Sequence, residues 1–143
     1  MEGALRTLDP DKHLFIWGAV KAEGYAEDDC IDIDELADLY ETYRGVDGET
    51  TRIKLKNRGA TVMLRLAESS PTNALLSAIR ELDKAGLGVF PLTVKSVGTG
   101  TYFAAKCWIK KSPKVVKGRK VNVMEWAFEV AKLDRFDGFV LPT

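Results

Sequence analysis

The sequence ATVMLRLAESSPTNALLSAIRELDKAGLG, residues 60–88, decides the fold because it joins a strand pattern directly to a helix pattern. Val62, Leu64 and Leu66 are spaced by two residues, which places their side chains on one face of a β-strand. That face is expected to lie against a hydrophobic core.

The second half of this stretch predicts one α-helix over about residues 71–85. Ser70 can cap the helix, and Pro71 fits the first helical position, where the N–H that proline lacks would have no partner. Gly86 can end the helix because glycine adopts the left-handed conformation at low cost. The helix carries an apolar stripe at helical spacing, formed by Leu75, Leu76, Ile79 and Leu82.

Segments rich in strand-forming residues lie on both sides of this centre. They cover residues 12–20, 30–36, 89–97, 101–111 and 120–134. Gly18 interrupts the first segment and predicts a bulge or bend, whereas Gly98 to Gly100 predict a hairpin turn between the third and the fourth. The sequence lacks the alternation of strands with helices that builds parallel sheets.

These patterns define a mainly β fold class. We expect about seven strands in a small antiparallel β-barrel or sandwich, with one flanking α-helix. The length of 143 residues predicts a single domain over residues 1–143.

Residues 39–56 predict a long polar hairpin arm. Tyr40 and Thr42 alternate with Glu41 and Tyr43, and the sequence GVDG at residues 45–48 marks a turn. The sequence TRIKLKN then alternates clearly, as a returning strand would. Helical spacing also fits the first half of the segment, through Leu36, Leu39, Tyr40 and Tyr43.

The net charge is zero, but the charge is divided into two blocks of opposite sign. Residues 22–50 contain eleven acidic residues and one basic residue, Arg44. Residues 104–120 contain seven basic residues and no acidic residue. A neutral total made of opposite blocks indicates that the blocks meet, within one molecule or between copies.

Motifs for catalysis, metal binding or secretion are not visible in the sequence. His13 is the only histidine, and Cys30 and Cys107 lie far apart, so the ligand set of a structural zinc site is missing. No glycine-rich phosphate loop and no nucleophile motif occurs. We therefore expect that the protein is not an enzyme and that it binds no metal and no cofactor. The chain is also expected to stay in the cytosol, without a membrane span or a secretion signal.

Two functions fit the charged blocks. Lysines beside Tyr102, Phe103 and Trp108 on a small barrel are typical of a protein that binds single-stranded nucleic acid. However, such proteins are usually basic overall. The other function is self-assembly, because patches of unlike charge on separate surfaces form a head-to-tail contact that closes into a ring or continues as a filament. Exposed edge strands could extend a sheet between copies. Solvent-facing loops of a monomer explain the two blocks equally well.

Three stretches resemble the tail tube proteins of contractile-tailed bacteriophages. They are GATVMLRLAESSPTNALLSAI, VFPLTVKSVGTGTYFAAKCWIKKSPKVVKG and EWAFEVAKLD. The shared pattern is a leucine-rich strand, then Ser-Pro and Asn-Ala-Leu-Leu at the start of the helix, then a hairpin, a basic connection and a strand with Trp126 and Phe128. The resemblance covers about residues 12–135.

The resemblance implies a structural subunit of a phage tail tube. Hexameric rings of this subunit would stack into a hollow tube that conducts DNA during ejection, without binding it specifically. The partners implied are further copies of the chain and the tail sheath, baseplate and tail-terminator proteins. The protein would belong to the virion tail and be assembled in the host cytoplasm. The arm would reach the adjacent ring, with Tyr40, Tyr43 and Arg44 as anchors.

The candidate site is therefore a set of contacts between subunits. The predicted contact residues lie in the acidic block, in the arm and in the basic block: Asp32, Asp34, Glu35, Tyr40, Tyr43, Arg44, Lys110, Lys111, Lys114, Lys117 and Arg119.

Overall fold

A computed structural model describes residues 13–26, 30–96 and 100–137. The elements in chain order are β1 (His13–Trp17), β2 (Val20–Lys21), β3 (Ile31–Glu35), β4 (Tyr40–Arg44), β5 (Thr50–Lys54), β6 (Ala60–Ala67), α1 (Thr72–Asp83), β7 (Phe90–Ser96), β8 (Gly100–Lys111), β9 (Val123–Val130) and β10 (Asp134–Asp137). The predicted mainly β fold class with one helix is confirmed for this part of the chain.

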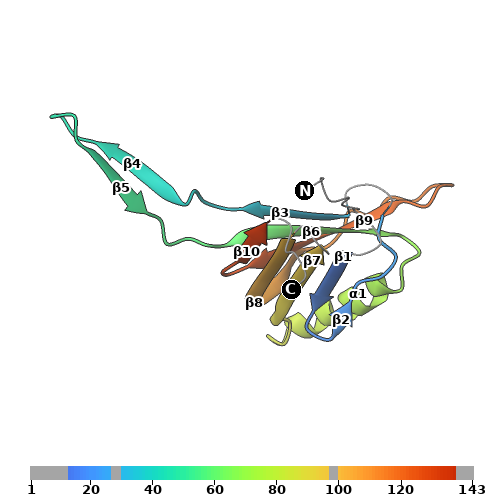
Figure 1. Ribbon diagram of the computed structural model, residues 1–143. Coiled ribbons are helices and arrows are strands. Elements are labelled where there is room, and N and C mark those ends of the chain that lie inside the picture. The colour runs from blue at the N-terminus through green and yellow to red at the C-terminus, as the bar shows by residue number, and fades with distance from the viewer. Residues whose placement is uncertain (1–12, 27–29, 97–99, 138–143) are drawn as a thin grey trace, which may run out of the picture.

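The main sheet has the strand order β2-β1-β7-β8-β9-β6-β3, and β10 pairs with β8 beside this path. All of its pairings are antiparallel. In Figure 1, β3, β6 and β9 lie along one direction, and β1, β7 and β8 cross it beneath them. Because β2 and β3 do not pair, the sheet is sandwich-like and not a closed barrel.

The core lies between these two groups of strands. Trp17 is at its centre: its ring contacts Phe128 at 5.1 Å and Phe90 at 5.4 Å between centroids, both edge to face. Its indole Nε1–H donates to the backbone oxygen of Cys107 at 2.9 Å, so the one polar atom of this buried ring is satisfied. The predicted inner face of β6 is confirmed, because Val62, Leu64 and Leu66 are fully buried.

The junction between β6 and α1 is held by polar side chains of the sequence SSPTN. Asn73 accepts a hydrogen bond from the indole Nε1–H of Trp126 at 2.9 Å and donates to the backbone oxygen of Ala67 at 3.0 Å. Ser70 accepts from the backbone N–H of Thr72 at 3.3 Å. However, the N-cap of α1 is Pro71 and no side chain of the described residues caps the helix, so the prediction of Ser70 as the cap and Pro71 as the first helical residue is wrong by one position. This motif thus ties the helix start to β6 and β9.

The helix begins at Thr72 and buries a narrower face than the sequence predicted. Leu76 is fully buried and Ile79 is half-buried, but Leu75 and Leu82 are each 52% exposed. The helix lies at the margin of the sheet near β2 (Figure 1). The buried or half-buried residues Thr72, Leu76 and Ile79 form the narrow face that packs on the core. Gly86 follows the helix with φ of +78°, as expected for its end.

Two strands were not expected from the sequence. The segment predicted as one strand over residues 12–20 is a hairpin, because Gly18 takes φ of +60° and donates its N–H to Pro91, after which β2 turns back along β1. The predicted bend at Gly18 is therefore a complete turn. The segment predicted as one strand over residues 120–134 ends at Val130, and β10 follows it as a separate strand.

The hairpin predicted between residues 89–97 and 101–111 is present as β7 and β8. Most of its predicted Gly98–Gly100 turn lies outside the described residues, as does the segment after Asp137.

Candidate functional site

The predicted arm is a two-stranded sheet that projects from the body of the molecule (Figure 1). It contains β4 and β5, paired from Tyr40 with Lys54 to Arg44 with Thr50. At its tip, the N–H of Gly45 donates to Glu49 at 2.7 Å, which closes the turn. Every residue of both strands is exposed. An isolated two-stranded hairpin is at best marginally stable in water, so this arm lacks the packing that a strand pair needs.

The two faces of the arm differ in chemistry. The alternation of a strand and the pairing register place Tyr40, Arg44 and Arg52 on one face. The guanidinium of Arg52 lies over the Tyr40 ring at 4.1 Å from its centroid. The opposite face carries Tyr43 and Ile53, which are 60% and 45% exposed. The three predicted anchors thus divide between the faces, with Tyr43 opposite the other two.

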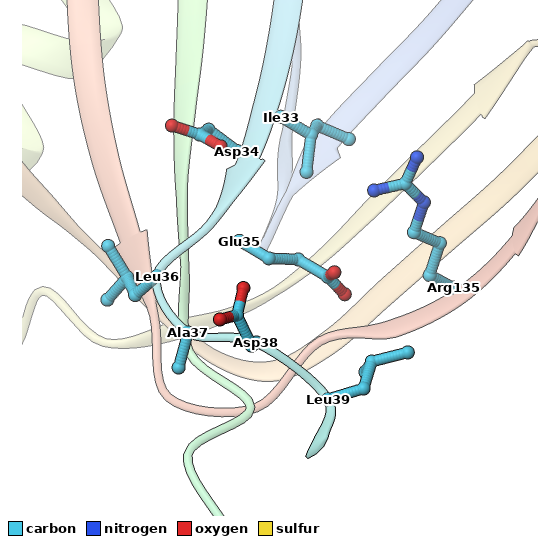
Figure 2. A pocket seen from close by; sticks show the side chains of 8 residues that line it. All are labelled: Ile33, Asp34, Glu35, Leu36, Ala37, Asp38, Leu39 and Arg135. Atoms are coloured by element: carbon cyan, nitrogen blue, oxygen red, sulfur yellow. The ribbon is translucent and has the colours of Figure 1, made fainter. Parts of the chain in front are cut away.

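A hollow of about 500 Å³ lies where β3 leads into the arm, lined by residues 33–39 and Arg135. Figure 2 shows the carboxylates of Glu35 and Asp38 at this hollow, with Arg135 on its far side. Leu36 and Leu39 are about half exposed beside them. The predicted acids Asp34 and Glu35 therefore lie at the edge of the main sheet, next to the base of the arm.

Arg135 is held in place by its own strand. Its Nε pairs with the Asp137 carboxylate at 2.7 Å, and that carboxylate also accepts from the Tyr102 hydroxyl at 2.6 Å. These two donors lower the pKa of Asp137, Tyr102 being the stronger influence. Arg135 is therefore a fixed cation at the hollow, whose other charged lining residues are acids.

Asp32, another predicted contact, is used inside the subunit. Arg65 on β6 reaches Asp32 on β3 at 3.7 Å and Glu125 on β9 at 2.8 Å, which links three neighbouring strands across the outer face of the sheet.

The basic block forms the end of β8 and the connection over residues 112–122. Lys117 pairs with Glu68, and the ammonium together with the backbone N–H of Asn122 lowers the pKa of that carboxyl. Asn122 donates to the backbone oxygen of Val116 at 2.8 Å. Lys117 is thus already bonded within the subunit.

The other predicted basic contacts are exposed: Lys110, Lys111, Lys114 and Arg119. Within the described residues, none of these four forms an ion pair. Val115 and Val121 in the same connection are 69% and 68% exposed, so the connection is apolar as well as basic.

The arm and the basic connection lie at opposite ends of the molecule (Figure 1). The arm and the base from which it projects therefore do not meet the basic connection within one subunit. Across the described ranges, no helix is long and apolar enough to cross a membrane, and no group of three or more histidine, cysteine or carboxylate side chains is arranged to hold a metal.

Residues 17–138 match the sequence family described as the bacteriophage PhiTE tail tube protein. The chain belongs to this family. The tail tube protein is a structural component of the virion tail and not an enzyme, as the sequence predicted. Over 111 residues it is 27% identical to "Structural protein ORF10" of Pseudomonas phage KPP10, a match that covers 75% of this chain. The matched part spans 64% of the length of that relative.

Solved structures share the fold of this tail tube protein at 10–12% sequence identity. One is the tube-terminating cap of the anti-feeding prophage, with a TM-score of 0.63 over 96% of both chains. Another comes from the sheath–tube complex of an extracellular contractile injection system, with a TM-score of 0.64 over 92% of both chains. A third, from the sheath/tube terminator of such a system, has a TM-score of 0.66 and covers 94% of this chain and 99% of that one.

Among the charged residues of the hollow, sequence reasoning missed Asp38 and Arg135 as site residues. Asp38 was counted in the acidic block but not singled out. Arg135 comes from a strand that the sequence did not predict, about one hundred residues away from β3. An isolated arginine next to Asp134 and Asp137 gives no signal of its own.

Proposed function

We propose that this tail tube protein assembles into hexameric rings that stack into a hollow tube, within a contractile tail, and that the tube conducts DNA during ejection. The observation that carries the proposal is the arm, a strand pair exposed on both faces with Tyr40, Tyr43 and Ile53 on its surface. Tyrosine and arginine are favoured at protein contacts because they bury a large area with few rotatable bonds or pair in a planar fork. A neighbouring ring would supply the packing that the arm lacks.

The separation of charge supports the same proposal. Acidic residues near the base of the arm and basic residues at the other end of the molecule define a heterologous contact, which propagates through successive copies. Complementary charge fixes register and orientation more than affinity. The sheath, baseplate and tail terminator are the further partners that this role implies, and a net charge of zero fits passage of DNA without specific binding.

The alternative, a barrel that binds single-stranded nucleic acid, has less support. Tyr102 is half-buried, and the guanidinium of Arg135 lies over its ring at 5.7 Å from the centroid, whereas Phe103 is 43% exposed. Trp108 is also half-buried on β8. Tight, sequence-tolerant binding with a steep salt dependence would favour this alternative.

Electron microscopy and sizing of the purified protein test the proposal. Rings or tubes are expected, and we expect the double substitution Tyr43→Ser with Ile53→Ser to prevent stacking without changing the melting temperature of the dilute subunit. Thr42→Ser with Thr50→Ser, on the opposite face, is the matched control and should assemble normally. Only monomers of the unaltered protein, even at high concentration and after seeding, would contradict the proposed function.

A further inference from the structure

We propose that the hollow beside the arm receives the basic connection of a second copy of this chain. The inference rests on the proposed self-assembly and names the two surfaces that meet. The first is the socket, defined here as Glu35, Leu36, Asp38, Leu39 and Arg135. The second is the plug, defined as residues 114–121.

The socket has an apolar part and an acidic part, and neither is covered within its own subunit. Leu36 and Leu39 are 49% and 52% exposed beside each other. Glu35 and Asp38 rim the same space, and neither forms an ion pair among the described residues. A suitable occupant presents apolar side chains flanked by cations.

The plug has this composition in a short stretch. Val115, Val116 and Val121 are between 49% and 69% exposed, and Lys114 and Arg119 are exposed beside them. Its shape is defined before any contact forms, because Lys117 pairs with Glu68 and Asn122 donates to Val116. A loop that is already ordered loses less entropy on binding.

The geometry requires two copies. The socket adjoins the arm and the plug lies at the far end of the body, so one chain cannot join them without unfolding (Figure 1). The ion pairs inside the subunit also show which charged residues already have partners. Asp32 and Lys117 have ion-pair partners within the subunit. In the described part of the chain, Glu35 and Asp38 in the socket and Lys114 and Arg119 in the plug form no ion pair, although Glu35 also interacts with the charge of Arg135. Each copy then offers one socket and one plug, which is a head-to-tail contact.

Charge exchange tests the contact directly. The socket variant carries Glu35→Lys and Asp38→Lys, and the plug variant carries Lys114→Glu and Arg119→Glu. Each alone places like charges at the contact, so the protein concentration needed for assembly should rise by about tenfold or more. Mixed in equal amounts, the two variants can alternate with opposite charges at every contact, and assembly should return. A chain carrying all four substitutions should assemble with itself but not with the unaltered protein.

The control variant carries Lys21→Glu and Lys95→Glu, two exposed residues outside socket and plug, and it changes the net charge as the plug variant does. It should assemble like the unaltered protein. Light scattering and electron microscopy follow assembly, and circular dichroism verifies folding. The socket proposal is wrong, while the proposed function stands, if the unaltered protein forms tubes and the socket variant and the plug variant each form them as well. The same holds if mixing these two variants does not restore assembly. Equal impairment of the control would assign the effect to net charge and also overturn the socket. Failure of the unaltered protein to assemble would contradict the proposed function itself.

Discussion

Asn73→Ala should destabilise the subunit by removing the link between the start of the helix and the sheet. The amide oxygen of Asn73 is the acceptor for the indole N–H of Trp126, a ring that is only 1% exposed. Its Nδ2 donates to the backbone oxygens of Ala67 at 3.0 Å and Glu68 at 3.3 Å. The substitution leaves a buried donor and two backbone acceptors without this partner.

The magnitude follows from these contacts. A buried donor without a partner costs about 1–3 kcal/mol, and one lost hydrogen bond of ordinary quality costs about 0.5–1.5 kcal/mol. The higher helix propensity of alanine offsets about 0.5 kcal/mol. We expect a net loss of about 2–3 kcal/mol in the free energy of unfolding, or a fall of about 6–12 °C in the melting temperature of a domain of this size.

Urea denaturation of the dilute, unassembled subunit measures the loss, with tryptophan fluorescence as the signal. Asn73→Asp is the matched control: it keeps the acceptor for Trp126 but lacks the Nδ2 donor, so it should lose less. Trp126→Phe removes the indole N–H, and the double mutant with Asn73→Ala should show a coupling of about 1–2 kcal/mol. A loss below about 0.5 kcal/mol, or additive effects in the cycle, would refute the reasoning.

Three further predictions concern single sites. Burial raises the pKa of the Cys107 thiol to about 12, so at pH 8 this thiol should react with a thiol reagent only after denaturation. Equally fast labelling of the unaltered native protein and of Cys107→Ser would assign the reactivity to Cys30. A difference in labelling between these two native proteins would contradict the prediction. Gly24→Ala should lower the melting temperature more than Gly48→Ala. Both glycines have positive φ, but only at Gly24 would the new Cβ meet another side chain, that of Ser70 at 2.8 Å. Equal falls in the melting temperature would show that this contact does not matter. Because the pKa of Glu68 is lowered in the folded protein, its carboxylate stabilises the fold above the unfolded pKa, and this contribution is lost as the pH falls through the folded pKa. Glu68→Gln should therefore lower the melting temperature at pH 7, and the melting temperatures of the two proteins should converge in acid. A difference in melting temperature that stays constant with pH would exclude the charge as its cause.

The sequence predicted best where alternation is complete. In β6 the apolar residues at every second position are the buried ones, so the pattern alone identified strand and face. In β9, Trp126, Phe128 and Val130 are buried in the same way, but Ala127 on the opposite face is buried as well. The arm was also predicted, because the GVDG turn and the alternation after it needed no knowledge of distant residues. The helix was predicted by local signals, but its buried width was not, because that depends on where α1 lies on the sheet.

The misses have one physical origin, which is pairing across long separations in sequence. β10 is four exposed residues with no apolar alternation, and it exists as a strand because it pairs with β8 and because Asp137 binds Tyr102. In the same way, no residue near Lys117 in sequence predicts its ion pair with Glu68, and no sequence pattern predicts the ion pair between Arg65 and Asp32. The predicted contact residues in the arm and the basic block that are exposed here remain predictions until assembly is observed.

The length of β8 has a mechanical consequence. Along one side, β8 pairs with β7 from Gly100 to Cys107. Along the other side it pairs first with β10 and then, from Cys107 to Lys111, with β9, and the basic connection leaves from its end at Lys111. A pull applied to that connection along the strand would load both ladders in shear, so many hydrogen bonds would share the force at once, whereas a pull across the strand would peel them apart one by one. A subunit tugged by its neighbours through this loop should therefore yield first at the loop itself, and the folded body behind it should remain intact.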